Sequence, residues 1–125
     1  MASYDQFVLD TDEPSGYDFT AKDETGERYI CVKSTEGSFD NPIHISYNEL
    51  LQMREATNYD LYRVYEVVDL RARLRIVHNM KGFAEKALTV LEQLPNGVRP
   101  DSISVSPGVL DFESPLSLEL PDDEE

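Results

Sequence analysis

A turn cluster between two β-favouring stretches constrains the fold of this chain more than any other feature. Residues 16–20 and 28–33 both alternate between polar and apolar side chains, and Asp23-Glu24-Thr25-Gly26 lies between them. Alternation around a short turn cluster predicts an antiparallel β-hairpin. A two-residue or a four-residue loop gives the same register, in which the numbers of paired residues sum to 49. Asp18 is then expected opposite Cys31.

The register also divides the side chains of the hairpin between two faces. Residues i and i+2 of a strand share a face, so Asp18, Cys31 and Lys33 are expected on one side. The core is expected on the other side, which carries Tyr17, Phe19, Ile30 and Val32. The hairpin therefore predicts a polar cluster on one face, with a thiol at its centre.

The rest of the chain alternates between strand and helix signals. Ser46-Tyr47-Asn48-Glu49 fits a capping box and predicts a helix over 47–56. Apolar spacing predicts a second helix from about 80 to 94. Extended segments are expected within 3–13, at 43–45, over 59–68 as a central strand, over 71–77 as an amphipathic strand, and at 103–105.

These elements predict one α/β (α+β) domain with a mixed β-sheet and two helices. We place this domain at residues 1–106 and assign 107–125 to an acidic tail containing Pro and Leu. The tail is expected to be a solubilising appendage, or alternatively a partner-binding strand formed by its alternating leucines.

Charge separates the possible functions. The net charge is −14 in 125 residues, and 111–125 carry seven acids without a base. Such a field disfavours nucleic acid and favours a protein partner, in particular a basic one. The single cysteine, and the lack of a leader or a long apolar run, predict a cytoplasmic protein that does not enter the membrane.

Four segments together resemble one known family. They are Gly16-Tyr17-Asp18-Phe19, residues 27–34 (ERYICVKS), Ser46-Tyr47-Asn48-Glu49 and residues 59–65 (YDLYRVY). Their order is similar to the C-terminal domain family named after the plant protein NO VEIN. That family resembles PD-(D/E)xK nucleases, whose carboxylates and lysine form a divalent-metal phosphodiesterase site. The resemblance implies a reduced PD-(D/E)xK-like core.

The resemblance assigns roles to four residues. Asp18 matches the first carboxylate and is the one metal ligand implied, Lys33 matches the lysine, and Glu49 matches the acid at the start of the helix. Cys31 stands where the family has a glutamate, and a thiol is a poor ligand for Mg²⁺. The implied catalytic set is therefore vestigial, and Lys33 is expected to pair with Asp18. Glu49 is also explained by the capping box alone.

Two other groups of residues are weaker candidates for a functional site. Arg63, Arg71, Arg73 and Arg75 form a basic stripe that either contacts phosphate or serves as a solvated or edge-strand face. His44 and His78 lie far apart without a second thiol, so no zinc site is expected, and both are expected to be surface or capping groups.

The sequence therefore predicts a non-catalytic, nuclease-like interaction module of a nucleic-acid-processing or defence-related system, without a cofactor. One alternative is a metal-dependent nuclease that uses Mg²⁺ or Mn²⁺, in which Glu27, Glu36 or Glu49 replaces the lost carboxylate. A second alternative is an acidic decoy whose carboxylates mimic DNA phosphates.

Overall fold

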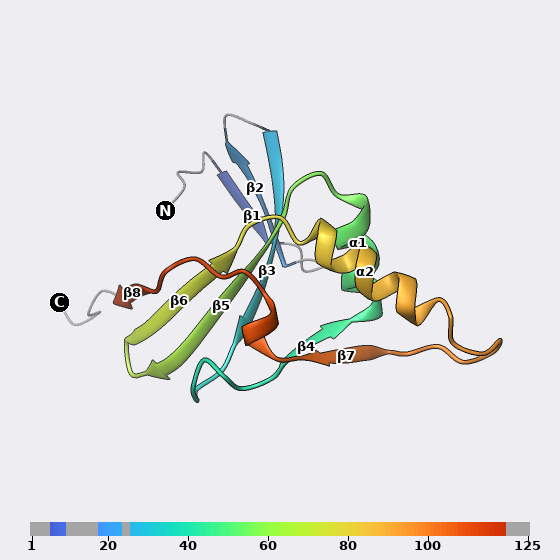
Figure 1. Cartoon of the computed structure of the whole chain (residues 1–125). Coiled ribbons are helices and arrows are strands. Elements are labelled where there is room, and N and C mark those ends of the chain that lie inside the picture. The colour runs from blue at the N-terminus through green and yellow to red at the C-terminus, as the bar shows by residue number, and fades with distance from the viewer. Residues whose placement is uncertain (1–5, 10–17, 24–25, 120–125) are drawn as a thin grey trace.

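The computed structural model describes residues 6–9, 18–23 and 26–119 (Figure 1). In these residues the helices are α1 (Tyr47–Glu55), α2 (Lys81–Leu91) and a short 3-10 helix, η1 (Pro107–Val109). The strands are β1 (Gln6–Leu9), β2 (Phe19–Asp23), β3 (Gly26–Ser34), β4 (Ile43–Ser46), β5 (Tyr59–Val68), β6 (Arg71–Val77), β7 (Ser102–Val105) and β8 (Leu116–Glu119). The predicted mixed sheet and two α-helices are confirmed.

The larger sheet has the strand order β1-β2-β3-β5-β6-β8. β3 and β5 are parallel, and every other neighbouring pair in it is antiparallel. Parallel neighbours need a crossover connection, and β4 and α1 supply it here. β4 also pairs with β7 in a separate two-stranded antiparallel sheet. Figure 1 shows α1 and α2 side by side next to the large sheet.

β2 and β3 pair in the predicted register. Phe19 lies opposite Ile30 and Asp23 lies opposite Gly26, whose φ of 116° is readily adopted only by glycine. The regular ladder ends at Phe19, and the amide of Asp18 donates to the carbonyl oxygen of Ile30 at 2.9 Å. The register of the hairpin is therefore confirmed, but the expected Asp18–Cys31 pair lies just outside the ladder.

The helix-covered core lies on the face of β3 that carries Cys31, which corrects the prediction that this face is polar. Cys31 is fully buried in a cluster that includes Leu50 and Met53 of α1 and Ala84 and Leu88 of α2. Ile30, on the other face, is 1% exposed. β3 is thus buried on both sides, so alternation along it could not show which face the helices cover. Tyr17 lies outside the described residues.

The remaining predicted elements agree closely with the structure. The first helix begins after Ser46 as expected, and the strands predicted at 59–68 and 71–77 are β5 and β6. α2 is shorter than predicted, because the amides of Gln93 and Leu94 bond to carbonyls three residues back and tighten the chain into turns.

Residues 107–119 pack on the domain, which corrects the expectation of a free appendage from residue 107. β8 pairs with β6, so that Leu116 lies opposite Leu74 and Glu119 opposite Arg71. The amide of Glu113 donates to the carbonyl oxygen of Ile76 at 2.9 Å. β6 is therefore an interior strand rather than the edge strand considered above. Residues 120–125, the end of the predicted acidic tail, lie outside the described residues.

Arg75 of β6 holds this C-terminal segment. Its guanidinium donates to the carbonyl oxygens of Glu113 at 2.7 Å and Phe112 at 3.3 Å. The same group lies 4.6 Å from the ring centre of Phe39 and 5.6 Å from that of Phe112. Since cation–π contact adds to the hydrogen bonds, one side chain joins the sheet, the 35–42 loop and the C-terminal segment.

Removal of residues 111–125 is expected to lower the melting temperature by more than about 10 °C. The deletion strips β8 from β6 and removes Phe112 from the core, and each kcal/mol lost shifts a small domain by about 4–8 °C. Thermal unfolding followed by circular dichroism measures this. Val109→Ala is the control, because Val109 is 70% exposed and its loss should cost less than about 0.5 kcal/mol. An unchanged melting temperature of the 1–110 chain would contradict the assignment of β8 to the sheet.

Candidate functional site

The Glu49 carboxylate is the centre of the candidate site. The Lys33 ammonium donates to its two oxygens at 2.8 and 2.9 Å, and the Cys31 thiol lies 3.4 Å from Oε2. Lys33 and Glu49 are largely buried, with side-chain exposures of 20% and 14%. Three of the four predicted site residues therefore meet where β3 passes the N-terminus of α1.

The local sequence fixes the position of Glu49. The amide of Glu49 donates to Ser46 Oγ at 3.0 Å, and the amide of Ser46 donates to Glu49 Oε1 at 2.8 Å. This reciprocal pair is the predicted capping box, which satisfies two donors that the start of a helix leaves without partners. The carboxylate that caps α1 therefore also binds Lys33, so Glu49 belongs to both the helix cap and the site.

Asp18 lies beside this group but has a different partner. Its Oδ2 accepts the amide of Val32 at 2.7 Å. Lys33 bonds to Glu49, so the expectation that Lys33 pairs directly with Asp18 is corrected. Asp18 still acts on the site through its charge, which helps to raise the pKa values of Cys31 and Lys33.

The electrostatics of the site favour a neutral thiol and a charged lysine. Burial raises the pKa of Cys31 far above its usual value of 9.0, and the negative charge of Glu49 raises it further. Burial alone would lower the pKa of Lys33, but the carboxylates of Glu49 and Asp18 favour the charged ammonium and the net shift is upward. A buried, protonated thiol is a poor nucleophile, so Cys31 is a packing residue at neutral pH.

The donor set does not fit a divalent metal ion such as Mg²⁺. That ion needs several free oxygen ligands, whereas both oxygens of Glu49 are held by Lys33 and one oxygen of Asp18 by a backbone amide. No three His, Cys, Asp or Glu side chains within 6–9, 18–23 and 26–119 are grouped as metal ligands. Of the proposed replacement acids, Glu49 is at the site, whereas Glu27 and Glu36 are exposed.

The four arginines of the predicted stripe differ in their exposure to solvent. Arg63 is 2% exposed, and its guanidinium donates to the carbonyl oxygen of Asn41 at 2.7 Å. Its burial lowers its pKa and keeps it from an external phosphate. Arg75 is occupied by the C-terminal segment, so only Arg71 and Arg73 remain exposed.

A second charged cluster was not recognised in the sequence. Asp60 is fully buried in β5, where Arg28 binds it through two nitrogens at 2.9 Å each. The amide of Asn79 donates to it at 3.0 Å, and His78 Nδ1 lies 3.3 Å away and Nε2 3.4 Å from Glu113. The sequence signal for this cluster is an acidic residue within an otherwise apolar strand. A carboxylate at such a position is buried and therefore needs several hydrogen-bond donors around it. His78 is exposed, as expected of a surface group, and it also lies within reach of the carboxylates of Asp60 and Glu113.

Fold and site together define a small α+β domain with an aspartate, a thiol and a lysine beside a capped helix. The family described as Protein NO VEIN, C-terminal, matches residues 4–77, which is more than half of the chain. The chain belongs to this family. Searches of curated proteins and of solved structures found no match. Among the described residues, no helix is long and apolar enough to cross a membrane.

Glu49→Gln is expected to lower the free energy of unfolding by about 1–3 kcal/mol. The amide can still cap α1, but it leaves the largely buried Lys33 without a charged partner. Glu92→Gln is the matched control, because Glu92 pairs with Arg54 at 3.2 Å on the surface and is 55% exposed, so its loss should cost less than about 0.5 kcal/mol. Urea denaturation measures both, and equal losses would contradict a special role of Glu49.

The raised pKa of Cys31 predicts a loss of stability at alkaline pH. Above its ordinary value of 9.0, the thiol of the unfolded chain loses its proton while the folded chain keeps it. The free energy of unfolding should therefore fall by up to about 1.4 kcal/mol per pH unit between about pH 9 and 10. The shifts of Lys33 and Tyr59 act in the same direction at higher pH.

Urea unfolding at pH 8, 9 and 10 tests this prediction. Cys31→Ala removes the titrating thiol, so the free energy of unfolding should change less with pH between pH 8 and 10. The loss of packing in this variant lowers the stability by the same amount at every pH and does not affect the slope. The same slope in both proteins would show that Cys31 does not titrate as proposed.

Proposed function

We propose that this chain is a non-catalytic interaction module built on a nuclease-like scaffold. The observation that carries this proposal is the bidentate contact of Lys33 with Glu49 beside the Cys31 thiol. The charges of this arrangement are already balanced, because Lys33 neutralises the carboxylate of Glu49 that a metal ion would otherwise need as a ligand.

The resemblance to PD-(D/E)xK nucleases supports the loss of activity. In that reading Asp18 and Lys33 keep two catalytic positions, and Cys31 replaces the second carboxylate. Hydrolysis by this route needs a held ion to activate water and stabilise the leaving oxygen. A protonated, buried thiol supplies neither charge nor an oxygen ligand, so the vestigial set serves to join β3 to α1.

The charge of the chain supports a protein partner with a basic surface. The net charge of −14 disfavours the phosphate backbone of nucleic acid and accelerates encounter with a positive surface. We place the module in a nucleic-acid-processing or defence-related system, where nuclease-like scaffolds belong. Cytoplasmic location is part of this proposal.

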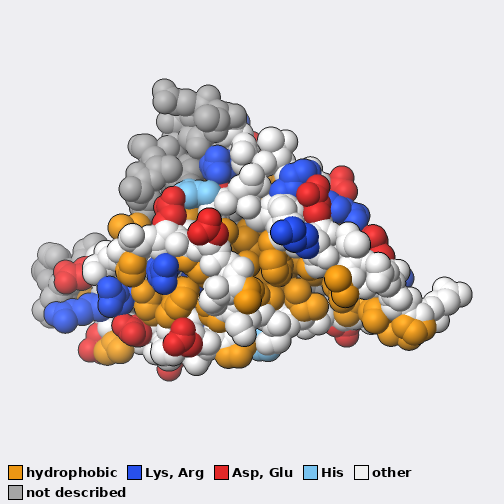
Figure 2. Space-filling view, viewed as in Figure 1, with side chains coloured by type: hydrophobic (Ala, Val, Ile, Leu, Met, Phe, Trp, Pro, Cys, Tyr) orange, Lys and Arg blue, Asp and Glu red, His pale blue; other side chains and the backbone are white. Residues whose placement is uncertain are grey.

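One observation favours the second candidate, a metal-dependent nuclease. Glu49 Oε2 lies 3.4 Å from the Cys31 thiol, so Glu49 is placed to substitute for the lost carboxylate. Metal binding would require Lys33 to release Glu49. The decoy candidate needs regular rows of acids, and Figure 2 shows the acidic side chains of the visible face scattered among basic and apolar ones.

We expect the unaltered chain to show no tight binding of Mn²⁺ in titration calorimetry and no cleavage of single- or double-stranded DNA with Mg²⁺ or Mn²⁺. Cys31→Glu adds the missing oxygen ligand beside Asp18 and is expected to create measurable Mn²⁺ binding. Cys31→Ser is the control, because it changes the thiol without adding a charge.

Tight Mn²⁺ binding by the unaltered chain, together with its loss in Glu49→Gln, would establish the relocated-carboxylate nuclease instead. Circular dichroism of each variant ensures that a loss of binding is not a loss of folding.

A further inference from the structure

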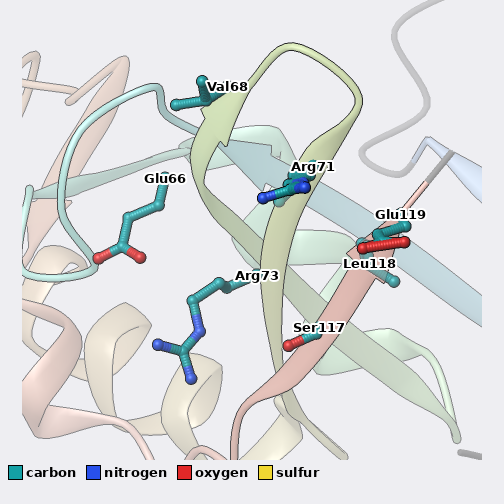
Figure 3. A pocket seen from close by; sticks show the side chains of 8 residues that line it. Glu66, Val68, Arg71, Arg73, Ser117, Leu118 and Glu119 are labelled. Carbon is teal, nitrogen blue, oxygen red and sulfur yellow. The ribbon is translucent and has the colours of Figure 1, made fainter.

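A hollow of about 600 Å³ opens at the free end of the β5–β6 hairpin, bounded by β8 (Figure 3). Its lining includes Arg71 and Arg73 of β6, Ser117 and Glu119 of β8, and Glu66 and Val68 of β5. None of these residues takes part in the contacts of Glu49 described above. Its volume lies in the range of small-molecule sites, about 300–1,000 Å³.

Two free guanidiniums give the hollow its chemistry. Arg71 and Arg73 are two positions apart in β6, so they project from the same face about 6.6 Å apart along the strand. Both are exposed, and within the described part of the chain neither guanidinium forms a hydrogen bond or an ion pair. Arginine forks match the oxygens of a phosphate, which favours an anionic group at this place.

The facing strand adds a neutral donor. Ser117 is the register partner of Arg73, and Figure 3 shows both side chains on the same side of the sheet. Cross-strand partners have Cβ atoms about 4.5–5.5 Å apart, so the hydroxyl and the guanidinium can reach the same anion. Arg71, Arg73 and Ser117 therefore form a donor group supported by two paired strands.

The other polar residues of the lining have the opposite character. Glu119 is the register partner of Arg71, Glu66 belongs to β5, and both offer only acceptors. Val68 is 61% exposed and offers an apolar surface. A bare anion would meet repulsion from the two acids, whereas a phosphate ester carrying hydroxyl or amino donors and a flat ring would have partners for the acids as well as for the arginines.

We propose that this hollow binds a nucleotide-sized phosphate ester, with the phosphate on Arg71, Arg73 and Ser117 and the sugar or base donors on Glu66. Such a ligand is either a free mononucleotide or the terminal 5′-phosphate of a single strand. The proposal is independent of the function proposed above, because it uses none of the residues of the Glu49 site.

The negative net charge does not prevent this binding. At physiological ionic strength, charges further away than about 8 Å are largely screened, so the charges of the hollow itself matter most. Its two arginines and two glutamates balance formally, and the guanidinium forks of Arg71 and Arg73 supply the directed donors for a phosphate. The acids of the hollow then select against inorganic phosphate. At neutral pH inorganic phosphate offers Glu66 no hydrogen-bond donors comparable to those of a sugar or a base.

Titration calorimetry of the full chain with guanosine 5′-monophosphate, guanosine and inorganic phosphate tests the proposal. We expect saturable binding of the monophosphate, no detectable binding of guanosine, and at least about tenfold weaker binding in Arg71→Gln and Arg73→Gln. Glu66→Gln should weaken binding of the monophosphate without weakening that of inorganic phosphate. Arg99→Gln is the matched control, because Arg99 is an exposed arginine outside the hollow, and it should bind as the unaltered chain does.

A short oligonucleotide with and without a 5′-phosphate separates the two sources of the ligand. Tighter binding of the phosphorylated strand than of the mononucleotide would identify a strand end, and the reverse would identify a free nucleotide. The proposal is overturned if no monophosphate binding saturates at millimolar concentration, if guanosine binds equally well, or if Arg99→Gln weakens binding as much as Arg73→Gln. Equal binding of the two oligonucleotides, as tight as that of the monophosphate, would overturn it as well.

Discussion

The salt bridge between Lys33 and Glu49 is the interaction on which the centre of this domain depends. It joins the middle strand pair of the large sheet to the first turn of α1, and the same carboxylate closes the capping box with Ser46. A largely buried ion pair is stable only when its remaining hydrogen-bonding capacity is satisfied, and here the backbone and the Cys31 thiol satisfy it. The attachment of α1 to β3 and the loss of free metal ligands follow from this contact, whereas the thiol stays protonated mainly because it is buried.

A similar use of charge organises the opposite side of the sheet and its edge. Arg28 and His78 surround the buried Asp60, and Arg75 reaches over Phe39 to the C-terminal segment. Each of these side chains joins elements that lie far apart in the sequence. Arg28 and Arg75 are therefore structural bases, held by partners inside the domain.

Membership of the family described as Protein NO VEIN, C-terminal, rests on residues 4–77, whereas α2, β7 and β8 lie beyond the matched part. The matched part holds the Asp18, Cys31, Lys33 and Glu49 group. The proposed nucleotide hollow combines Arg71 and Arg73 from the matched part with Ser117 from outside it. The two proposed functions thus occupy separate parts of the sheet and can be tested separately.

The sequence by itself determined the local structure: the register of the β2–β3 hairpin, the Ser46–Glu49 capping box and the extents of β5 and β6. These depend on contacts between near neighbours or on side-chain periodicity, which a sequence displays directly. Only the tertiary structure decided the partner of Lys33, the burial of Cys31 and the attachment of β8 to β6. Burial on both faces of β3 conceals which side meets the helices. A short strand such as β8, with few apolar side chains between acids and prolines, resembles a tail until its partner strand is placed beside it.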